Sequence, residues 1–237
     1  MQVELKHHTP LYIAAESIRT AWQSFDKSDT TRVAERRHRA SEDSAVEVKV
    51  VCGDKDRALI KRVGVDCRHS STLEHLVYHF HISGVSRALL QEFSRHRIAS
   101  LTVKSTRYTL KELKHEATFC ISEDRDEDDK EKDEIWRRAS RYLVMTGDAT
   151  VDAASIAGLE RVRVLLQQGT ANDKVKFALP EAYQTEIAWT INARSLRNFM
   201  QLRSAPAALW EMRRLSEHIY RALPDEHKYL YEDVIQL

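Results

Sequence analysis

The chain has 237 residues, of which 42% are hydrophobic, enough for a substantial core, and this favours one domain over residues 1–237. Its 37 Lys and Arg side chains are balanced by 36 Asp and Glu side chains, so the net charge does not favour nucleic acid or an acidic membrane as a partner. No apolar run approaches the roughly 20 residues of a membrane-spanning helix, and no signal peptide is recognisable, so we expect a cytoplasmic protein.

Cysteine and glycine usage excludes several common kinds of site. The three cysteines are odd in number and lack CxxC spacing, so we expect reduced thiols and neither a disulfide frame nor a zinc ribbon. None of the six glycines belongs to a GxGxxG or GxxxxGK(S/T) sequence. A bound nucleotide would therefore be held mainly by side chains.

The N-terminal quarter has a mixed pattern. Residues 11–24 have apolar positions close to helical spacing, and the charged residues 25–44 are typical of a surface segment. Residues 46–51 alternate as in a strand or hairpin arm. Residues 55–63 predict a helix, which we expect Gly64 to end.

Residues 74–82 alternate cleanly and predict a strand. Its apolar face carries Leu76, Tyr78, Phe80 and Ile82, and its other face carries His75, His79 and His81. Histidines at every second position could bind a metal, but no carboxylate or cysteine has a fitting spacing. Imidazoles on the wetter face of a half-buried sheet explain the pattern as well, and we expect no metal site.

A helix is predicted over residues 85–95, with Val85, Leu89 and Phe93 as its apolar stripe. Glu92 lies between these positions in projection. It either pairs with a nearby arginine or contacts a ligand.

The C-terminal half predicts further helices and one strand. Residues 134–145 and 150–168 are amphipathic, residues 184–192 alternate as in a strand, and residues 193–203 form a helix whose apolar stripe ends on an arginine. We expect a last helix to begin at Pro206. Long helices with few, non-repeating strands indicate an α+β fold.

Residues 95–108 concentrate phosphate-binding chemistry. Arg95, Arg97 and Arg107 are accompanied by the hydroxyls of Ser100 and Ser105. The planar guanidinium group binds phosphate through two parallel hydrogen bonds. The stretch is therefore either an anion site or, more plainly, a basic surface loop.

The spacing of this stretch resembles a known signature. Arg95-His96-Arg97, followed after seven residues by Ser105 and then by Arg107-Tyr108, is similar to the signature of the flavin-dependent thymidylate synthases. Further similarities to that family are His69, Glu74-His75, Asn192-Ala193-Arg194-Ser195-Leu196, Asn198, Leu202-Arg203 and Trp210-Glu211. The resemblance covers roughly residues 66–108 and 176–211.

The resemblance implies a single catalytic domain with a central, mostly antiparallel sheet flanked by long helices. It implies conversion of dUMP to dTMP, with FAD as cofactor, methylenetetrahydrofolate as carbon donor and NADPH as reductant. It also implies a homotetramer with shared active sites. Residues 26–50 and 120–172 resemble the family weakly, and we expect them to be variable surface or helical insertions.

The resemblance also assigns residues to roles. The implied FAD ligands are Ser71, Arg95, His96, Arg97, Asn192, Arg194 and Asn198, with His69 as a possible accessory residue. The implied dUMP ligands are Glu92, Arg95, Val103, Lys104, Ser105, Thr106, Arg107, Lys176 and Arg203. Arg203 is the implied catalytic residue, which would stabilise negative charge on the uracil. No cysteine is an obvious nucleophile for uracil C6, and a reduced flavin can supply a hydride itself.

Several positions depart from the family pattern. They are Thr102-Val103, Glu92, Lys176 and Ala207, where many relatives have Asn-Glu, Gln, Arg and His. Ser105 is more economically a phosphate ligand than a nucleophile, because no histidine and aspartate partners are visible from spacing. Two other functions stay open, a non-catalytic nucleotide- or RNA-binding protein and a flavin-dependent reductase of another substrate.

Overall fold

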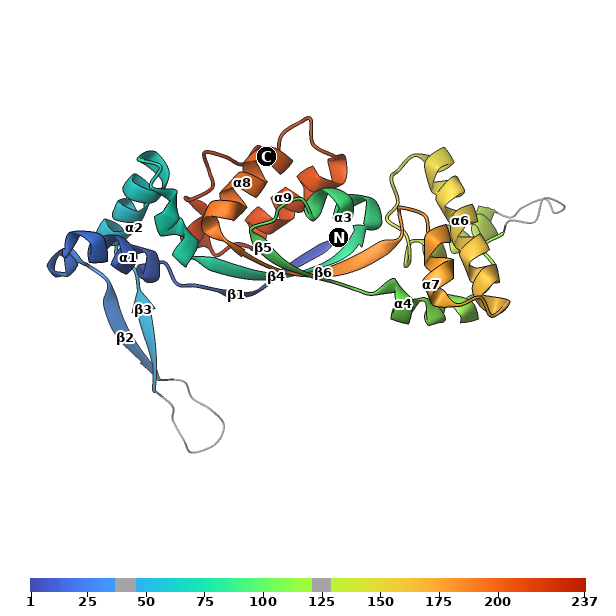
Figure 1. The fold of residues 1–237 in the computed structure, drawn as a ribbon, viewed down its shortest axis with the longest axis horizontal. Helices are drawn as coiled ribbons and strands as arrows, with labels where there is room; N and C mark the ends of the chain where they lie inside the picture. Colours follow the sequence, from blue (N-terminus) through green and yellow to red (C-terminus); the bar gives the residue numbers. More distant parts are fainter. Residues whose placement is uncertain (37–45, 121–128) are drawn as a thin grey trace. The chain divides into compact units, whose positions relative to one another are not determined.

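The structure, a computed structural model, describes residues 1–36, 46–120 and 129–237. It combines helices with a four-stranded sheet of order β1-β4-β6-β5 and a separate two-stranded sheet (Figure 1). The four strands are β1 (Gln2–His8), β4 (Val77–Ser86), β6 (Gln184–Asn192) and β5 (Ala99–Val103). The predicted α+β class is confirmed. No helix of the described ranges is long and apolar enough to cross a membrane.

The chain divides into two compact units, which are described separately. The first unit comprises Met1–Gln2, His81–Arg95 and Leu101–Ala188, and the second comprises Val3–Phe80, His96–Ser100 and Trp189–Leu237. Each of the strands β4, β5 and β6 contributes residues to both units. The expectation of one catalytic domain over 1–237 stays a prediction.

In the second unit, α1 (Tyr12–Trp22) confirms the first predicted helix and is followed by a short 3-10 helix (Phe25–Lys27). The segment 25–44 is not only a surface loop, because it contains β2 (Thr31–Arg36). This strand pairs antiparallel with β3 (Val46–Val51), with Thr31 opposite Val51. Residues 46–51 form one arm of a hairpin, as their alternation allowed, whereas the charged residues 31–36 gave no local sign of a strand. Residues 37–44 of the segment lie outside the described ranges.

The helix α2 (Asp54–Ile60) does not end at Gly64, contrary to the sequence expectation. It continues as a π-helix (Lys61–Asp66) that includes this glycine. A Cβ atom on Gly64 would lie 2.7 Å from Cδ2 of Leu73, which is fully buried. The glycine therefore permits close packing and does not act as a cap.

A buried ion pair joins α1 to α2. Arg19 donates to Asp56 Oδ1 from Nε at 2.7 Å and from Nη2 at 2.5 Å. The hydroxyls of Ser28 and Thr30 donate to Asp56 Oδ2 at 2.5 and 2.7 Å. Asp56 is fully buried and Arg19 nearly so. Each charge therefore has several partners in a place without water, as a buried ion pair requires.

The strand predicted over 74–82 begins later than expected. A 3-10 helix (Ser70–His75) precedes β4, whose residues Tyr78, Phe80 and Ile82 are fully buried as predicted. Val85 belongs to this strand and not to the next helix, because that helix, α3 (Arg87–Phe93), begins after a cap in which Leu89 N donates to Ser86 Oγ. Leu89 and Phe93 are buried, as the predicted stripe requires.

The first unit contains its own hydrophobic core. Besides α3, it contains α4 (Thr106–Thr109), a 3-10 helix (Leu110–His115), α5 (Asp129–Ala139), α6 (Ala149–Gln167), α7 (Asn172–Val175) and a 3-10 helix (Lys176–Ala178). Leu113, Ile135, Leu159 and Val162 are among the buried side chains that hold them together. The helix expected over 134–145 ends already at Ala139. The helix expected over 150–168 is confirmed as α6, which Asp148 caps.

The end of β6 and the helix that follows it carry four of the predicted site residues. The strand β6 has the predicted bounds, and α8 (Ala193–Arg203) follows it directly, also as predicted. The last long helix, α9 (Trp210–Ala222), begins after Pro206, which lies in a turn and not at the helix start. A short helix, α10 (Asp225–Lys228), completes the chain's regular structure.

Candidate functional site

A cavity in the second unit collects three of the predicted site residues. It has a volume of about 390 Å³ and is lined by His69, Ser71 and Arg194, together with Arg68 and the exposed Trp22. His69 and Ser71 come from the segment before β4, and Arg194 comes from the first turn of α8. The lining thus offers guanidinium, hydroxyl and imidazole donors around one hollow, which suits an anionic ligand.

The local backbone sets the position of these groups. Arg68 has a φ of 58°, which is uncommon for a residue with a side chain, and turns the chain into the 3-10 helix. Thr72 Oγ1 donates to the carbonyl of His69 at 2.8 Å. Arg194 Nη1 donates to Glu74 Oε1 at 2.6 Å, and both side chains are about half exposed. A ligand on Arg194 would share this guanidinium with Glu74.

Asn192 serves the helix α8 as its N-cap. Its Oδ1 accepts a hydrogen bond from Ser195 N at 2.8 Å. Asn198 lies on the exposed side of the same helix, four residues after Arg194, so both side chains point the same way. Asn192 thus caps α8, a role in the fold that the sequence analysis did not predict.

A hydrogen bond joins the two motifs that carried the resemblance. Arg203 Nε donates to His96 Nε2 at 3.0 Å, although the residues are 107 positions apart in the sequence. Desolvation and the nearby Arg203 cation lower the pKa of His96 to about 4, so its ring is neutral at pH 7 and its Nε2 can accept this bond. The ring also packs edge-on against buried Phe199 at 4.9 Å. Sequence spacing gave no sign of this contact.

In the first unit, Lys104 is paired with an acid. Its Nζ donates to Glu186 Oε1 at 2.8 Å, and its backbone N donates to the Glu186 carbonyl at 2.9 Å. Both residues line a second cavity of about 350 Å³, with Glu112 and Arg141. The sequence analysis did not identify Glu186 as a site residue. Its outward-facing position on the strand 184–192 was the one signal that could have pointed to it.

Ser105, Thr106 and Arg107 lie where β5 gives way to α4. Ser105 precedes the helix, Thr106 is buried, and Arg107 is exposed with its guanidinium 5.6 Å from the ring of Tyr108. Among the described residues, no carboxylate forms an ion pair with Arg107 and no histidine bonds to Ser105 Oγ. The role of Ser105 as a phosphate ligand and not a nucleophile stays a prediction.

Lys176 follows a helix that is tied to the Arg107 segment. Asn172 Nδ2, in the first turn of α7, donates to the carbonyl of Arg107 at 2.9 Å. Lys176 begins the 3-10 helix directly after α7 and is half-buried. This bond thus ties the segment of Lys176 to that of Arg107, and both are predicted dUMP ligands.

The remaining predicted residues have simpler surroundings. Glu92 is half-buried on α3, and Val103 is the half-buried last residue of β5. Arg95 in the first unit and Arg97 in the second are both exposed. Within the described ranges, no carboxylate forms an ion pair with either arginine.

Two histidines of β4 lie beside polar partners, and Cys52 has a shifted pKa. His79 Nδ1 lies 2.7 Å from Thr190 Oγ1, and His81 Nε2 lies 3.8 Å from a Glu186 oxygen. Burial raises the pKa of Cys52 to about 11, so its thiol is protonated at pH 7. Cys52 is therefore unsuited to attack a substrate.

Comparison with known proteins places these residues in context. Residues 4–227 match the family model described as thymidylate synthase complementing protein. The flavin-dependent thymidylate synthase of Wolinella succinogenes is 51% identical over 231 residues, covering 98% of this chain and 97% of that protein. The enzyme of that name from Helicobacter pylori strain 26695 is 46% identical over 100% of both chains. A crystal structure of thymidylate synthase X from Helicobacter pylori with FAD and dUMP has a TM-score of 0.84, covering 100% of both chains.

Proposed function

Because this chain belongs to the flavin-dependent thymidylate synthase family, we propose that it binds FAD and dUMP and converts dUMP to dTMP. In this reaction methylenetetrahydrofolate donates the carbon and NADPH supplies the reducing equivalents. The observation that carries the proposal is the full-length similarity, at 46% identity, to a Helicobacter pylori enzyme crystallised with FAD and dUMP. The motif at 95–108 pointed to the same family.

The FAD ligands in this proposal are those that the resemblance implied. The cavity lined by Ser71 and Arg194, with His69 as an accessory residue, offers the donors that a diphosphate needs. The other FAD contacts are Arg95, His96, Arg97, Asn192 and Asn198. When bound and reduced, the flavin would supply a hydride. The thiol of Cys52 is protonated at pH 7 and is therefore a poor nucleophile for uracil C6.

The phosphate of dUMP is held by Ser105 and Arg107, with Lys104 and Lys176 as additional cations. This assignment is supported by the exposure of Arg107 and by the Asn172 bond that ties the Lys176 segment to it. Lysine offers a point charge where an arginine offers a fork, so Lys176 adds charge without bidentate geometry. The remaining dUMP contacts are Glu92, Arg95, Val103, Thr106 and Arg203.

Arg203 is the catalytic residue, acting on negative charge that develops on the uracil ring. The bond from its Nε to His96 fixes the plane of the guanidinium. A fixed cation in a partly dehydrated site stabilises such charge more than it would in water. Because His96 is neutral at pH 7, its ring accepts the hydrogen bond from Arg203 and positions this cation without repelling it.

The whole chain acts as one catalytic domain in the cytoplasm and assembles as a homotetramer with shared active sites. Residues 26–50 and 120–172 are variable insertions in this scheme. Size determination in solution tests the assembly, because a tetramer has four times the mass of the 27.5 kDa chain. A monomer that is fully active would refute the shared sites.

The decisive experiment is a tritium-release assay with labelled dUMP, methylenetetrahydrofolate and NADPH. We expect a yellow protein that releases tritium. A colourless protein that cannot be reconstituted with FAD would fit a nucleotide- or RNA-binding protein, and a flavoprotein without tritium release would fit a reductase of another substrate. Arg203→Ala should retain flavin and lose turnover by about 10²–10³-fold. Arg213→Ala, at an exposed position on α9, is the matched control and should retain activity.

A further inference from the structure

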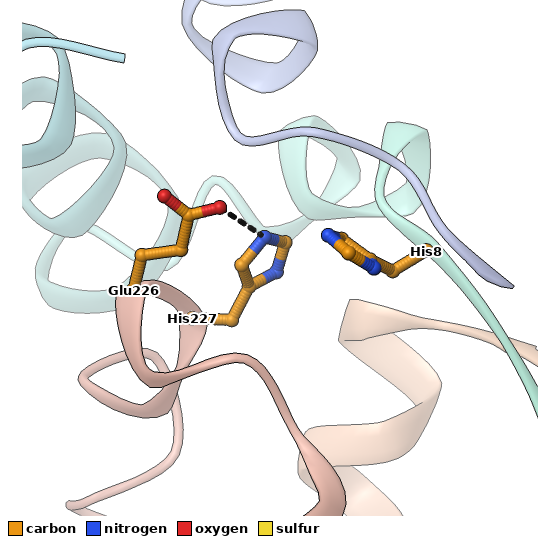
Figure 2. Close-up of side chains that lie close together, drawn as sticks. All are labelled: His8, Glu226 and His227. Atoms are coloured by element: carbon orange, nitrogen blue, oxygen red, sulfur yellow. Dashed lines mark ion pairs between the residues drawn. The ribbon is translucent and has the colours of Figure 1, made fainter. Parts of the chain in front are cut away.

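A cluster of possible metal ligands lies apart from the residues assigned above. His8 ends β1, and Glu226 and His227 lie on α10, all in the second unit. Each offers one ligand atom, and the three atoms lie within 4.8 Å of one another. Figure 2 shows the Glu226 carboxylate and the His8 imidazole next to the ring of His227.

His227 has a buried nitrogen that the fold leaves unsatisfied. Its side chain is fully buried, and its Nδ1 lies 2.8 Å from the hydroxyl of Tyr78. Its Nε2 has no hydrogen-bond partner among the described residues. Glu226 Oε1 lies 3.8 Å from this nitrogen, which is too far for a hydrogen bond. A buried polar atom without a partner costs free energy of folding, and a ligand on this nitrogen would remove that cost.

The neighbours of His227 are arranged to complete such a site. The ring of His8 lies 5.1 Å from the ring of His227, edge to face. The other oxygen of Glu226, Oε2, lies 3.9 Å from Arg57 Nη2, and this contact leaves Oε1 on the side of His227.

We propose that His8, Glu226 and His227 bind one Zn²⁺ ion, with water as the fourth ligand. Two imidazole nitrogens and one carboxylate suit zinc and not Mg²⁺ or Ca²⁺, which prefer oxygen ligands. Zinc bonds of about 2.0–2.1 Å place tetrahedral donors roughly 3.4 Å apart. The 3.8 Å between Glu226 and His227 needs only a small closure, which the exposed Glu226 side chain can make.

Tyr78 fixes the ligand geometry from outside the cluster. With zinc on Nε2, the proton of His227 lies on Nδ1 and is donated to the Tyr78 hydroxyl, 2.8 Å away. Such a bond to the second ring nitrogen orients metal-binding histidines generally. The ion would join the end of the first strand to the last helix, and this stabilises the fold independently of the dUMP reaction.

The test uses the full-length protein, stripped with a chelator, and Zn²⁺ alone as the probe. We expect calorimetry to show one tight site per chain, and Co²⁺ to give the visible absorption of a four-coordinate nitrogen and oxygen site. At a hundredfold excess over Kd, Zn²⁺ should raise Tm by about 5–10 °C. No binding to the stripped protein would overturn the proposal.

Variants distinguish this site from the protein's other histidines. His8→Ala and Glu226→Gln should weaken zinc binding at least tenfold, and Tyr78→Phe should weaken it by about 10–100-fold. His7→Ala is the matched control, because His7 is the exposed neighbour of His8 on the same strand and should bind zinc normally. Circular dichroism checks that each variant is folded. Equal affinity in His8→Ala and the unmodified protein would refute the assignment.

Discussion

The buried pair between Arg19 and Asp56 supports the helix α1, which lines the proposed flavin cavity, and it makes a sharp stability test. Asp56→Ala removes two hydrogen bonds from Arg19 and one each from Ser28 and Thr30. The Arg19 cation then keeps only its bonds to the carbonyls of Ser24 and Lys27, at 2.9 and 3.1 Å. It is left buried without a counter-charge.

The magnitude follows from this arrangement. Breaking a buried ion pair by removing one partner costs about 3–5 kcal/mol, because the other charge stays desolvated. For a chain of this size, this corresponds to a fall in Tm of roughly 6–20 °C. Asp54→Ala, two residues earlier on α2, is the control. The Asp54 side chain is fully exposed and its ion pair with Arg57 is 3.9 Å long, so it should cost less than about 1 kcal/mol.

The pH dependence gives the same test a second readout. Desolvation raises the pKa of Asp56, but hydrogen bonds from Ser28, Thr30 and Arg19 outweigh it and lower the pKa below 3.8. The stabilisation is therefore complete above pH 3.8 and is lost as the pH falls through the lowered value. The stability difference between Asp56→Ala and the unmodified protein should shrink only at such acidic pH.

Thermal and denaturant unfolding, with flavin content measured on the same samples, provide the assay. Replacing both partners, as in Arg19→Met with Asp56→Leu, should cost less than Asp56→Ala alone, because no buried charge is left unpaired. If Asp56→Ala and Asp54→Ala destabilised the protein equally, the reasoning from burial would be wrong.

Three further predictions concern the proposed site. Ser105→Ala should raise KM for dUMP more than it lowers kcat in steady-state assays, and a large loss of kcat alone would favour a nucleophilic serine. Asn192→Ala should cost about 1 kcal/mol of stability through the lost cap, whereas Asn192→Ser keeps the cap; loss of FAD in both would support a flavin contact, and retention in both would exclude it. NMR titration of the FAD-free protein should give His96 a pKa near 4. The contribution of His96 to the free energy of unfolding is therefore complete above pH 6.5 and declines as the pH falls towards 4. A midpoint near 6.5 would contradict the described burial.

Elements with strong periodicity could be predicted from the sequence, and elements that depend on distant partners could not. The strand β6 has the predicted bounds because its apolar and buried residues alternate with half-exposed ones. The helix α8 has the predicted bounds because its buried residues form one stripe at helical spacing. The strand β1 has only two apolar residues between polar ones and joins the sheet through pairing with β4. The strand β5 lies within the cation-rich motif, where no strand was predicted.

The candidate site shows the same division. The motif residues were identified by spacing, because the order of residue types along the chain is itself the signal. The partners Glu186 of Lys104, Glu74 of Arg194 and His96 of Arg203 were not predicted, since each depends on contacts between distant segments. The assignment of residues to FAD and dUMP stays a prediction that the experiments above address.

The hydrogen bond between Arg203 and His96 has a consequence for ligand affinity. Both bonded groups belong to the protein itself. Ordering a long side chain such as arginine costs up to about 2 kcal/mol of conformational entropy. Here that entropy is lost when the chain folds, so the ligand meets a cation that is already in place. Without the His96 ring, the Arg203 side chain would lose this conformational entropy when the ligand binds. A site of unchanged charge would then bind the ligand more weakly.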